Sequence, residues 1–248
     1  ISPFHRDSSR AMKQERWKHD MGIGINLGNT FESCGTWINN SSVTNYETGW
    51  GSPVVTQEMI QGYADCGFGV LRVPVAWSNM MQENYTIHPD YLARVHEVVD
   101  WALDAGLYVI LNIHYDSGWW DGFAVESEKD ECMTKYTRIW EQLSDAFKEE
   151  DDYLMFESLN EEGGWDSLWN RYGGSTKGKK ESFDLLNEIN QKFVDIVRGS
   201  KGYNNKRHLL IAGYGTDIGL TCDELFKMPK DPAKRCAVSV HYYTPSTF

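Results

Sequence analysis

The sequence predicts an α/β protein whose strands and helices alternate and build a parallel sheet. Short apolar runs recur along the 248 residues, and stretches with apolar residues at helical spacing separate them. This alternation is typical of strands joined by helical crossovers. Because 41% of the residues are apolar, the chain can bury one substantial core, so we expect residues 1–248 to form a single domain.

Six apolar runs are predicted to be strands. Continuous apolar runs of this length are typical of parallel strands that are buried on both faces. The runs are Met21–Leu27, Gly69–Val75, Leu107–Ile113, Tyr153–Leu159, His208–Ala212 and Ala237–Val240.

Four helices are predicted between these strands. Thr56 is a suitable N-cap for a helix that ends near Gly67. Apolar residues at helical spacing predict three more, and Gly106 and Gly199 are the expected ends of the first and third. Their apolar stripes are Leu92, Val95, Val99 and Ala102; Met133, Tyr136, Trp140, Leu143 and Phe147; and Leu186, Ile189, Phe193 and Val197.

The number of strand–helix units predicts an incomplete barrel. A (β/α)8 TIM barrel has eight strands, so six units leave it two short, or roughly 80 to 110 residues at this spacing. We expect this chain to supply about strands 1–6 and to be incomplete at its C-terminus, where 244–248 follow the sixth strand. Unpaired apolar edges invite aggregation, so a C-terminal complementing segment or a second chain should supply the rest. The alternative is an open doubly wound sheet that is complete.

Charge and composition exclude several partners. A net charge of -12 opposes binding to nucleic acid or anionic lipid, so a neutral partner is expected. No apolar run approaches the 18 or so residues of a membrane span, and the polar segment 1–20 lacks the core of a signal peptide. Ten tryptophans include several in polar loops, where indoles suit sugar rings. No C-x-x-C pair occurs, and most cysteines are expected in the core: Cys34, Cys66, Cys132, Cys222 and Cys236.

Polar residues leave three predicted strands at the same end. His114 follows the third strand, Asn160 and Glu161 the fourth, and His241 the sixth. The carboxyl ends of barrel strands carry the chemistry. A partly desolvated glutamate there can hold its proton near neutral pH and act as general acid on a glycosidic bond. The alternatives are a solvated glutamate and structural histidines.

Arg72 lies in the middle of an apolar strand, where a charged side chain requires a carboxylate partner. That pair is either structural or keeps an active-site acid ionised. Strict strand alternation puts Glu157 and Glu161 on one face and Asn160 on the other. Presenting both Asn160 and Glu161 to a ligand therefore requires a bend or bulge at the strand end.

Six segments, in this order, resemble the endo-β-1,4-glucanases of glycoside hydrolase family 5 over nearly the whole chain. They are Asn26–Phe31, Tyr46–Trp50, Leu71–Val75, Leu111–His114, Leu159–Glu161 and Val240–Tyr243. The resemblance implies a (β/α)8 barrel that hydrolyses cellulose or related β-glucans with retention, outside the cell and with no metal or organic cofactor.

The resemblance also implies roles for individual residues. Glu161 is similar to the acid/base, Asn160 to the partner of the sugar 2-hydroxyl, and Arg72 to the charge partner of the nucleophile. The residues implied to line the rest of the cleft are His114, His241 and Tyr243 at the scissile bond, and Asn29, Trp50, Trp119 and Trp120 further along. For each tryptophan, capping the core is an equally weighted alternative to sugar stacking.

Two departures from the family pattern matter. Glu162 replaces the usual proline and either raises the proton affinity of Glu161 or points into solvent. The family's nucleophile, a glutamate that ends strand seven, would lie beyond residue 248, so the isolated chain is predicted to be inactive. A non-catalytic carbohydrate-binding protein, or a xyloglucanase, lichenase or mannanase, remains an alternative.

Overall fold

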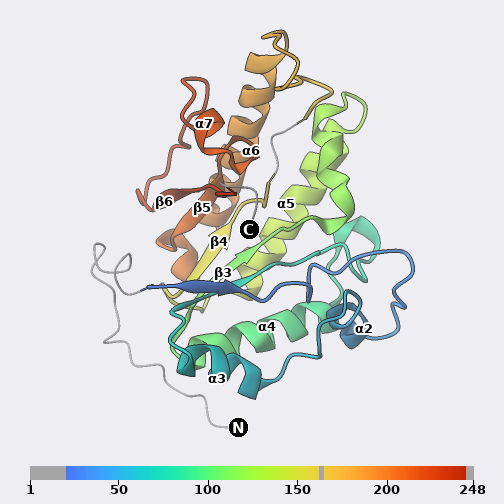
Figure 1. Cartoon of the computed structure of the whole chain (residues 1–248), viewed down its shortest axis with the longest axis vertical. Coiled ribbons are helices and arrows are strands. Elements are labelled where there is room, and N and C mark those ends of the chain that lie inside the picture. The colour runs from blue at the N-terminus through green and yellow to red at the C-terminus, as the bar shows by residue number, and fades with distance from the viewer. Residues whose placement is uncertain (1–20, 162–164, 244–248) are drawn as a thin grey trace.

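The computed structural model describes residues 21–161 and 165–243, and its centre is a parallel six-stranded sheet. The strands pair in chain order from β1 to β6 without a reversal, as Figure 1 shows from blue to red. A doubly wound sheet reverses its strand order, so that alternative is wrong and a partial barrel is confirmed. The strands are β1 (Gly24–Asn26), β2 (Val70–Val73), β3 (Tyr108–Asn112), β4 (Leu154–Glu157), β5 (Leu209–Ala212) and β6 (Cys236–Ser239).

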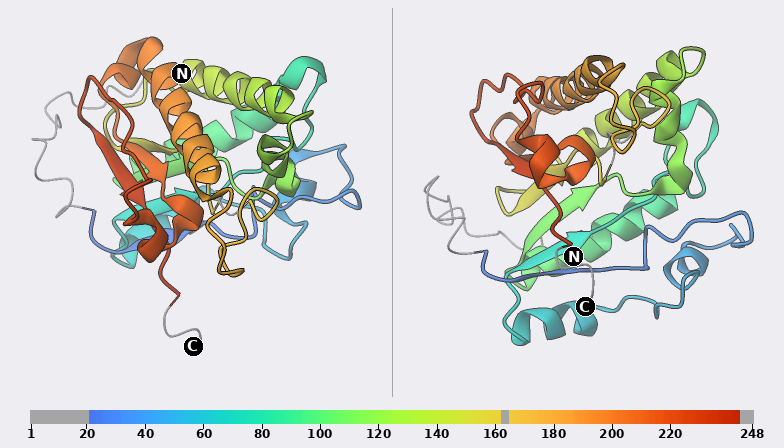
Figure 2. Two further views of the ribbon diagram at one scale, coloured as in Figure 1. Left: turned by 90° about the horizontal axis from the view of Figure 1, so that it is seen from above. Right: turned by 45° about the horizontal axis from the view of Figure 1, so that its top comes forward.

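All four predicted helices are present. They are α3 (Gln57–Asp65), α4 (Pro89–Asp104), α5 (Lys129–Ala146) and α6 (Lys179–Gly199), and the last two pack against each other (Figure 2). The Thr56 hydroxyl caps α3 by accepting a hydrogen bond from the Met59 amide at 3.3 Å. Helix α6 ends at Gly199, as predicted, and Ser200 is its C-cap.

The sequence analysis missed the short helical segments, because a single turn carries no apolar periodicity. These are α2 (Val43–Glu47), α7 (Ile218–Thr221) and the 3-10 segments η2 (Glu83–Tyr85), η3 (Asp116–Ala124), η4 (Gly202–Asn205) and η5 (Tyr214–Thr216).

The two faces of the sheet carry different side chains. Leu71 and Val73, with their counterparts on the other strands, belong to the large core shared with the helices. On the opposite face, Val70, Tyr108 and Met155 form a smaller buried cluster. We call the face with this smaller cluster the inner face of the sheet. Because side chains alternate along a strand, Arg72, two positions after Val70, lies on the same inner face and nearer the carboxyl end of β2.

The cysteines differ from expectation. Cys34 and Cys132 are buried, Cys236 is half-buried, and Cys66 and Cys222 are exposed, so the prediction that most lie in the core is wrong. The two exposed thiols directly follow α3 and α7, where the chain turns at the surface. Among the described residues, no helix has the length and apolar character that crossing a membrane requires.

Candidate active site at the carboxyl ends of the strands

Glu161 lies at the carboxyl end of β4 and is held by two side chains that follow β6. Its Oε1 atom lies 2.6 Å from Nδ1 of His241 and accepts a hydrogen bond from the Tyr243 hydroxyl. The backbone amide of His241 donates to the Thr216 carbonyl at 2.8 Å, which fixes the start of this segment. The glutamate side chain remains 43% exposed, so a ligand can reach it.

The surroundings of Glu161 favour its ionised form. Partial burial raises the pKa of Glu161, but hydrogen bonds from Tyr243 and His241 and the charge of His241 lower it below the ordinary value. The described surroundings therefore favour the carboxylate form of Glu161, whereas the sequence analysis expected a partly desolvated glutamate that holds its proton near neutral pH. Glu162, the other group invoked for its proton affinity, lies outside the described residues.

Arg72 has the carboxylate partner that its buried position requires. Its guanidinium lies 2.7 Å from Oε2 of Glu157, a side chain that is 2% exposed. Glu157 also accepts hydrogen bonds from Asn112 at 2.8 Å and Ser239 at 2.7 Å, so both of its oxygens are engaged. The pair joins the carboxyl ends of β2, β3, β4 and β6 from the inside of the sheet.

Asn160 is drawn into the same network. Arg72 Nη2 donates to Asn160 Oδ1 at 2.9 Å, while Arg72 Nε donates to Glu157 at 2.8 Å. Glu157 and Asn160 are three residues apart and would face opposite ways in a regular strand, yet both contact Arg72. The chain therefore bends after β4, as predicted. The bend leaves Asn160 against Arg72 and Glu161 against the residues after β6.

His114 extends the network along β3. Its Nδ1 atom lies 3.2 Å from the Asn112 side-chain nitrogen, an amide donor, which leaves the hydrogen of the neutral ring on Nε2. Burial and the positive charge of Arg72 lower the pKa of His114 to about 3. His114 is thus a neutral hydrogen-bond donor beside the site.

A groove of about 830 Å³ opens beside Glu161. Its aromatic lining includes Tyr172, 81% exposed, and Tyr242, 72% exposed, which are large flat surfaces available to a ligand. Residues that line it include Glu161, His241, Tyr243, Arg171, Tyr172 and Tyr242. His114, Asn29 and the three predicted tryptophans do not line this groove.

The tryptophans are half-buried and hydrogen-bonded through their indoles. Trp50 donates to the Cys34 carbonyl at 3.2 Å, and Trp120 donates to the Tyr115 carbonyl at 2.9 Å. Trp119 packs against the core with the Lys135 ammonium 4.6 Å from its ring centre. Trp120 also packs against the core. Both arrangements agree with the core-capping alternative, and sugar stacking by the three tryptophans stays a prediction.

Asn29 is exposed after β1, in the left-handed conformation (φ 56°). Its backbone amide and that of Thr30 donate to the buried Glu32 carboxylate, at 2.5 and 2.9 Å. Burial raises the pKa of Glu32 despite these bonds. The Asn29 side chain is thus presented at the rim on a fixed turn.

Sequence reasoning missed several residues of the network and the groove. Glu157 and Asn112 could have been found from strand alternation, because Glu157 lies two positions after Met155 and Asn112 two positions after Ile110, on the same face of the sheet. Ser239 could have been found in the same way from the sixth strand. Tyr172 and Arg171 come from a loop without periodicity, and no local signal places them next to Glu161.

Comparison with known sequences identifies the family of this chain. Residues 32–248 match the cellulase family, glycosyl hydrolase family 5. Endoglucanase B of Ruminococcus albus is 37% identical over 231 residues, 92% of this chain and 53% of the relative. A xyloglucan-specific endo-β-1,4-glucanase of Bacteroides ovatus is 35% identical over 92% of this chain and 44% of the relative.

Comparison with solved structures gives the same class. A GH5-4 broad-specificity endoglucanase from an uncultured bovine rumen ciliate superposes with a TM-score of 0.82 and 38% identity, over 96% of this chain and 63% of that one. The fold and these relatives define a glycoside hydrolase barrel. The chain belongs to glycosyl hydrolase family 5. It spans about half the length of the curated relatives it matches.

Proposed function

We propose that this chain forms the larger part of the catalytic domain of a retaining endo-β-1,4-glucanase, with Glu161 as acid/base. The observation that carries the proposal is the position of Glu161. It stands at the carboxyl end of β4 in an open groove, with His241 and Tyr243 on its carboxylate and the Arg72–Asn160 contact beside it. Barrel enzymes act at this end of their strands.

Retention requires a second carboxylate about 5 to 5.5 Å from Glu161 to attack the anomeric carbon. The described side chains that hydrogen-bond Glu161 are a histidine and a tyrosine. We assign the nucleophile to a glutamate beyond residue 248. This chain covers only 63% of the similar solved endoglucanase, so part of the barrel of such an enzyme is not represented in it. A C-terminal complementing segment or a second chain would bring it to Arg72, and residues 1–248 alone should have negligible turnover.

The nucleophile would also complete the proton chemistry of Glu161. A negative charge at that distance raises the pKa of a neighbouring carboxyl group, which the hydrogen bonds from His241 and Tyr243 now lower. Glu161 would then donate its proton to the leaving oxygen. Once the nucleophile is consumed in the glycosyl-enzyme, its charge is lost, the pKa of Glu161 falls, and Glu161 can take a proton from the attacking water.

Two neighbours are assigned supporting roles. Asn160, oriented by its hydrogen bond to Arg72, leaves its amide hydrogens for the sugar 2-hydroxyl, a contact that strengthens in the transition state. Arg72 keeps a second carboxylate ionised through its positive charge. Neutral His114 supplies a donor next to them.

The substrate is proposed to be cellulose or a related β-glucan. The relatives differ in their named substrates, one being specific for xyloglucan and another of broad specificity. Loop residues such as Tyr172, rather than the barrel, decide among cellulose, xyloglucan, mixed-linkage glucan and mannan. Since a polysaccharide does not enter a cell, we propose that the enzyme acts outside it.

The proposal is tested by hydrolysis of a soluble β-glucan with the longest natural form of the chain. Glu161→Gln should lower kcat/KM by about 10²- to 10⁴-fold, the usual contribution of general acid catalysis. A much smaller loss is expected in the first step on an aryl glycoside whose leaving group needs no proton. The exposed Glu224→Gln is the matched control. Wild-type rates in Glu161→Gln exclude it as the acid, and sugar binding without release of reducing ends favours the binding-protein alternative.

A further inference from the structure

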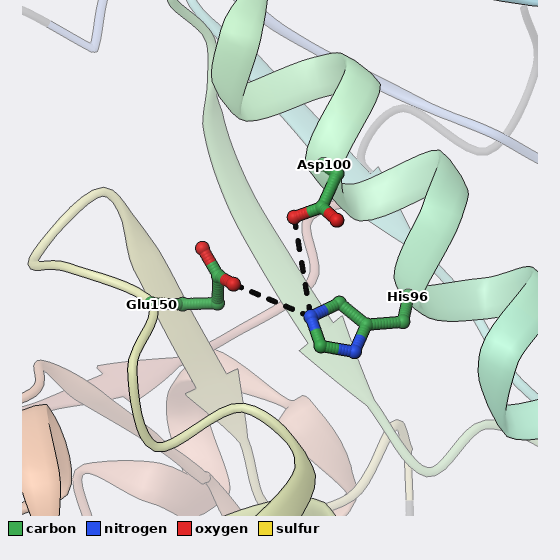
Figure 3. Close-up of side chains that lie close together, drawn as sticks. All are labelled: His96, Asp100 and Glu150. Atoms are coloured by element: carbon green, nitrogen blue, oxygen red, sulfur yellow. Dashed lines mark hydrogen bonds and ion pairs between the residues drawn. The ribbon is translucent and has the colours of Figure 1, made fainter. Parts of the chain in front are cut away.

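A histidine and two carboxylates from separate elements meet on the outside of the barrel. His96 and Asp100 project from α4 toward Glu150, which comes from the loop before β4 (Figure 3). His96 Nε2 lies 3.3 Å from Glu150 Oε1 and 3.9 Å from Asp100 Oδ1. One ligand atom of each residue lies within 4.8 Å of those of the other two.

We propose that this triad binds a divalent cation of the zinc class, far from the catalytic groove. An imidazole nitrogen with two carboxylate oxygens is a donor set that suits zinc, and a calcium site would use oxygens alone. Ligands about 2.1 Å from a tetrahedral zinc ion lie about 3.4 Å apart. The His96–Glu150 spacing of 3.3 Å is close to this value already, whereas Asp100, 3.9 Å from His96 and within 4.8 Å of Glu150, would have to move closer to both.

The surroundings hold the donors in place. The His96 ring packs against Phe147 with ring centres 4.4 Å apart, which fixes the direction of Nε2. The buried Arg207 guanidinium donates to the Glu150 carbonyl at 2.8 Å and to the Phe147 carbonyl at 2.7 Å, so the loop that carries Glu150 is anchored from below. Ligands held in this way lose little entropy when an ion binds.

Charge and access also favour a cation. A shallow groove of about 480 Å³ beside His96 and Asp100 is lined by two further carboxylates. Of these, Glu97 is paired with Arg94 at 2.6 Å, so the added negative charge comes mainly from Asp104. His96 is 30% and Asp100 45% exposed, so an ion can enter and keep one water ligand.

The site would have a structural role. Glu150 precedes the amino end of β4, whereas Glu161 follows its carboxyl end, so the ion lies at the opposite end of the strand from the hydrolytic groove. A bound ion would join α4 to the connection between α5 and β4. Because it binds the folded state, it should raise thermal stability without changing turnover directly.

The test uses chelator-treated protein in its longest natural form, titrated with zinc chloride and followed by calorimetry and thermal unfolding. We expect one equivalent to bind, and Tm to rise by about 5 °C at a free zinc concentration about 100-fold above Kd. Calcium chloride should give no such shift. His96→Gln and Glu150→Gln should each weaken binding at least about tenfold and remove the zinc-dependent shift.

His88→Gln is the matched control, since His88 lies at the start of the same helix, 4.0 Å from Asp90, and belongs to no such triad among the described residues. Its zinc-dependent shift should equal that of the wild type. Absence of zinc binding in the wild type would leave the triad as an ion pair and overturn the proposal. Equal binding by His96→Gln and Glu150→Gln, or a sulfur-ligand band in the cobalt-substituted protein, would assign the metal to the exposed cysteines and overturn it as well.

Discussion

Arg72 and Glu157 form a buried ion pair, 2.7 Å apart, between two strands that are separated by β3. Arg72 also donates a hydrogen bond to Asn160, so one guanidinium connects Glu157 inside the sheet to the residue that precedes Glu161. An arginine that is only 15% exposed keeps its charge at little cost only while its carboxylate is present. The pair therefore supports both the stability of the barrel and the shape of the site.

Glu157→Gln should destabilise the fold. The substitution keeps the size of the side chain but leaves the Arg72 charge buried without a counter-charge, and breaking such a pair costs about 3–5 kcal/mol. Urea denaturation measures the loss. The double variant Arg72→Met with Glu157→Gln should recover part of it, because no charge is then left unpaired. A single variant as stable as the wild type would show that water compensates the arginine.

Tyr243→Phe should change the pH dependence of hydrolysis. The Tyr243 hydroxyl is one of the two hydrogen-bond donors that lower the pKa of Glu161, so its removal raises that pKa. If Glu161 donates the proton, the alkaline limb of the kcat/KM profile moves to higher pH. The profile of the longest natural form on a soluble β-glucan gives the measurement. A shift to lower pH contradicts the assignment of Glu161 as acid.

The cysteines should separate into two classes by reactivity. Cys66 and Cys222 are exposed and should react with a thiol reagent in the native protein. Burial and the neighbouring Asp231 raise the pKa of Cys236 to about 12, so its thiolate is scarce and it should react slowly. Peptide mapping after brief labelling at neutral pH identifies the modified positions. Rapid labelling of Cys34, which is buried, would show that the segment after β1 opens in solution.

The barrel was predictable because its signal is periodic and local. Each predicted strand overlaps an observed one, and the α5 and α6 stripes carry Trp140 and Phe193, which pack 4.5 Å apart in the core. Thr56 was found because an N-cap depends on one side chain and one amide. Counting units predicted a partial barrel but left a doubly wound sheet as the alternative, and the sequential strand order decides for the barrel.

The site was predictable only where a strand end carried it. Glu161, Asn160 and Arg72 lie at or next to strand ends and were found, and strand alternation alone would have added Glu157. Tyr172 lies in a long loop whose path depends on contacts across the fold, so its place in the groove could not be predicted. The protonation of Glu161 was also missed, because it depends on two residues about 80 positions later.

Asp116 is expected to make stability depend on pH. This fully buried carboxylate accepts hydrogen bonds from the Ser78 amide and hydroxyl, both at 2.9 Å, and from the Trp119 indole at 2.7 Å. It thereby ties the segment after β2 to the tryptophan loop after β3. Burial raises the pKa of Asp116 from 3.8 to about 6 in spite of these bonds.

A raised folded-state pKa means that the folded protein binds the proton more tightly than the unfolded chain. The contribution of Asp116 to stability is therefore complete below about pH 4 and is lost as the pH rises to about 6, a change of about 3 kcal/mol. Asp116→Asn cannot titrate, so its free energy of unfolding should fall less between pH 4 and pH 7 than that of the wild type. Urea denaturation across this range measures both slopes. Parallel curves for the two proteins would show that Asp116 stays ionised throughout and that its hydrogen bonds outweigh its burial.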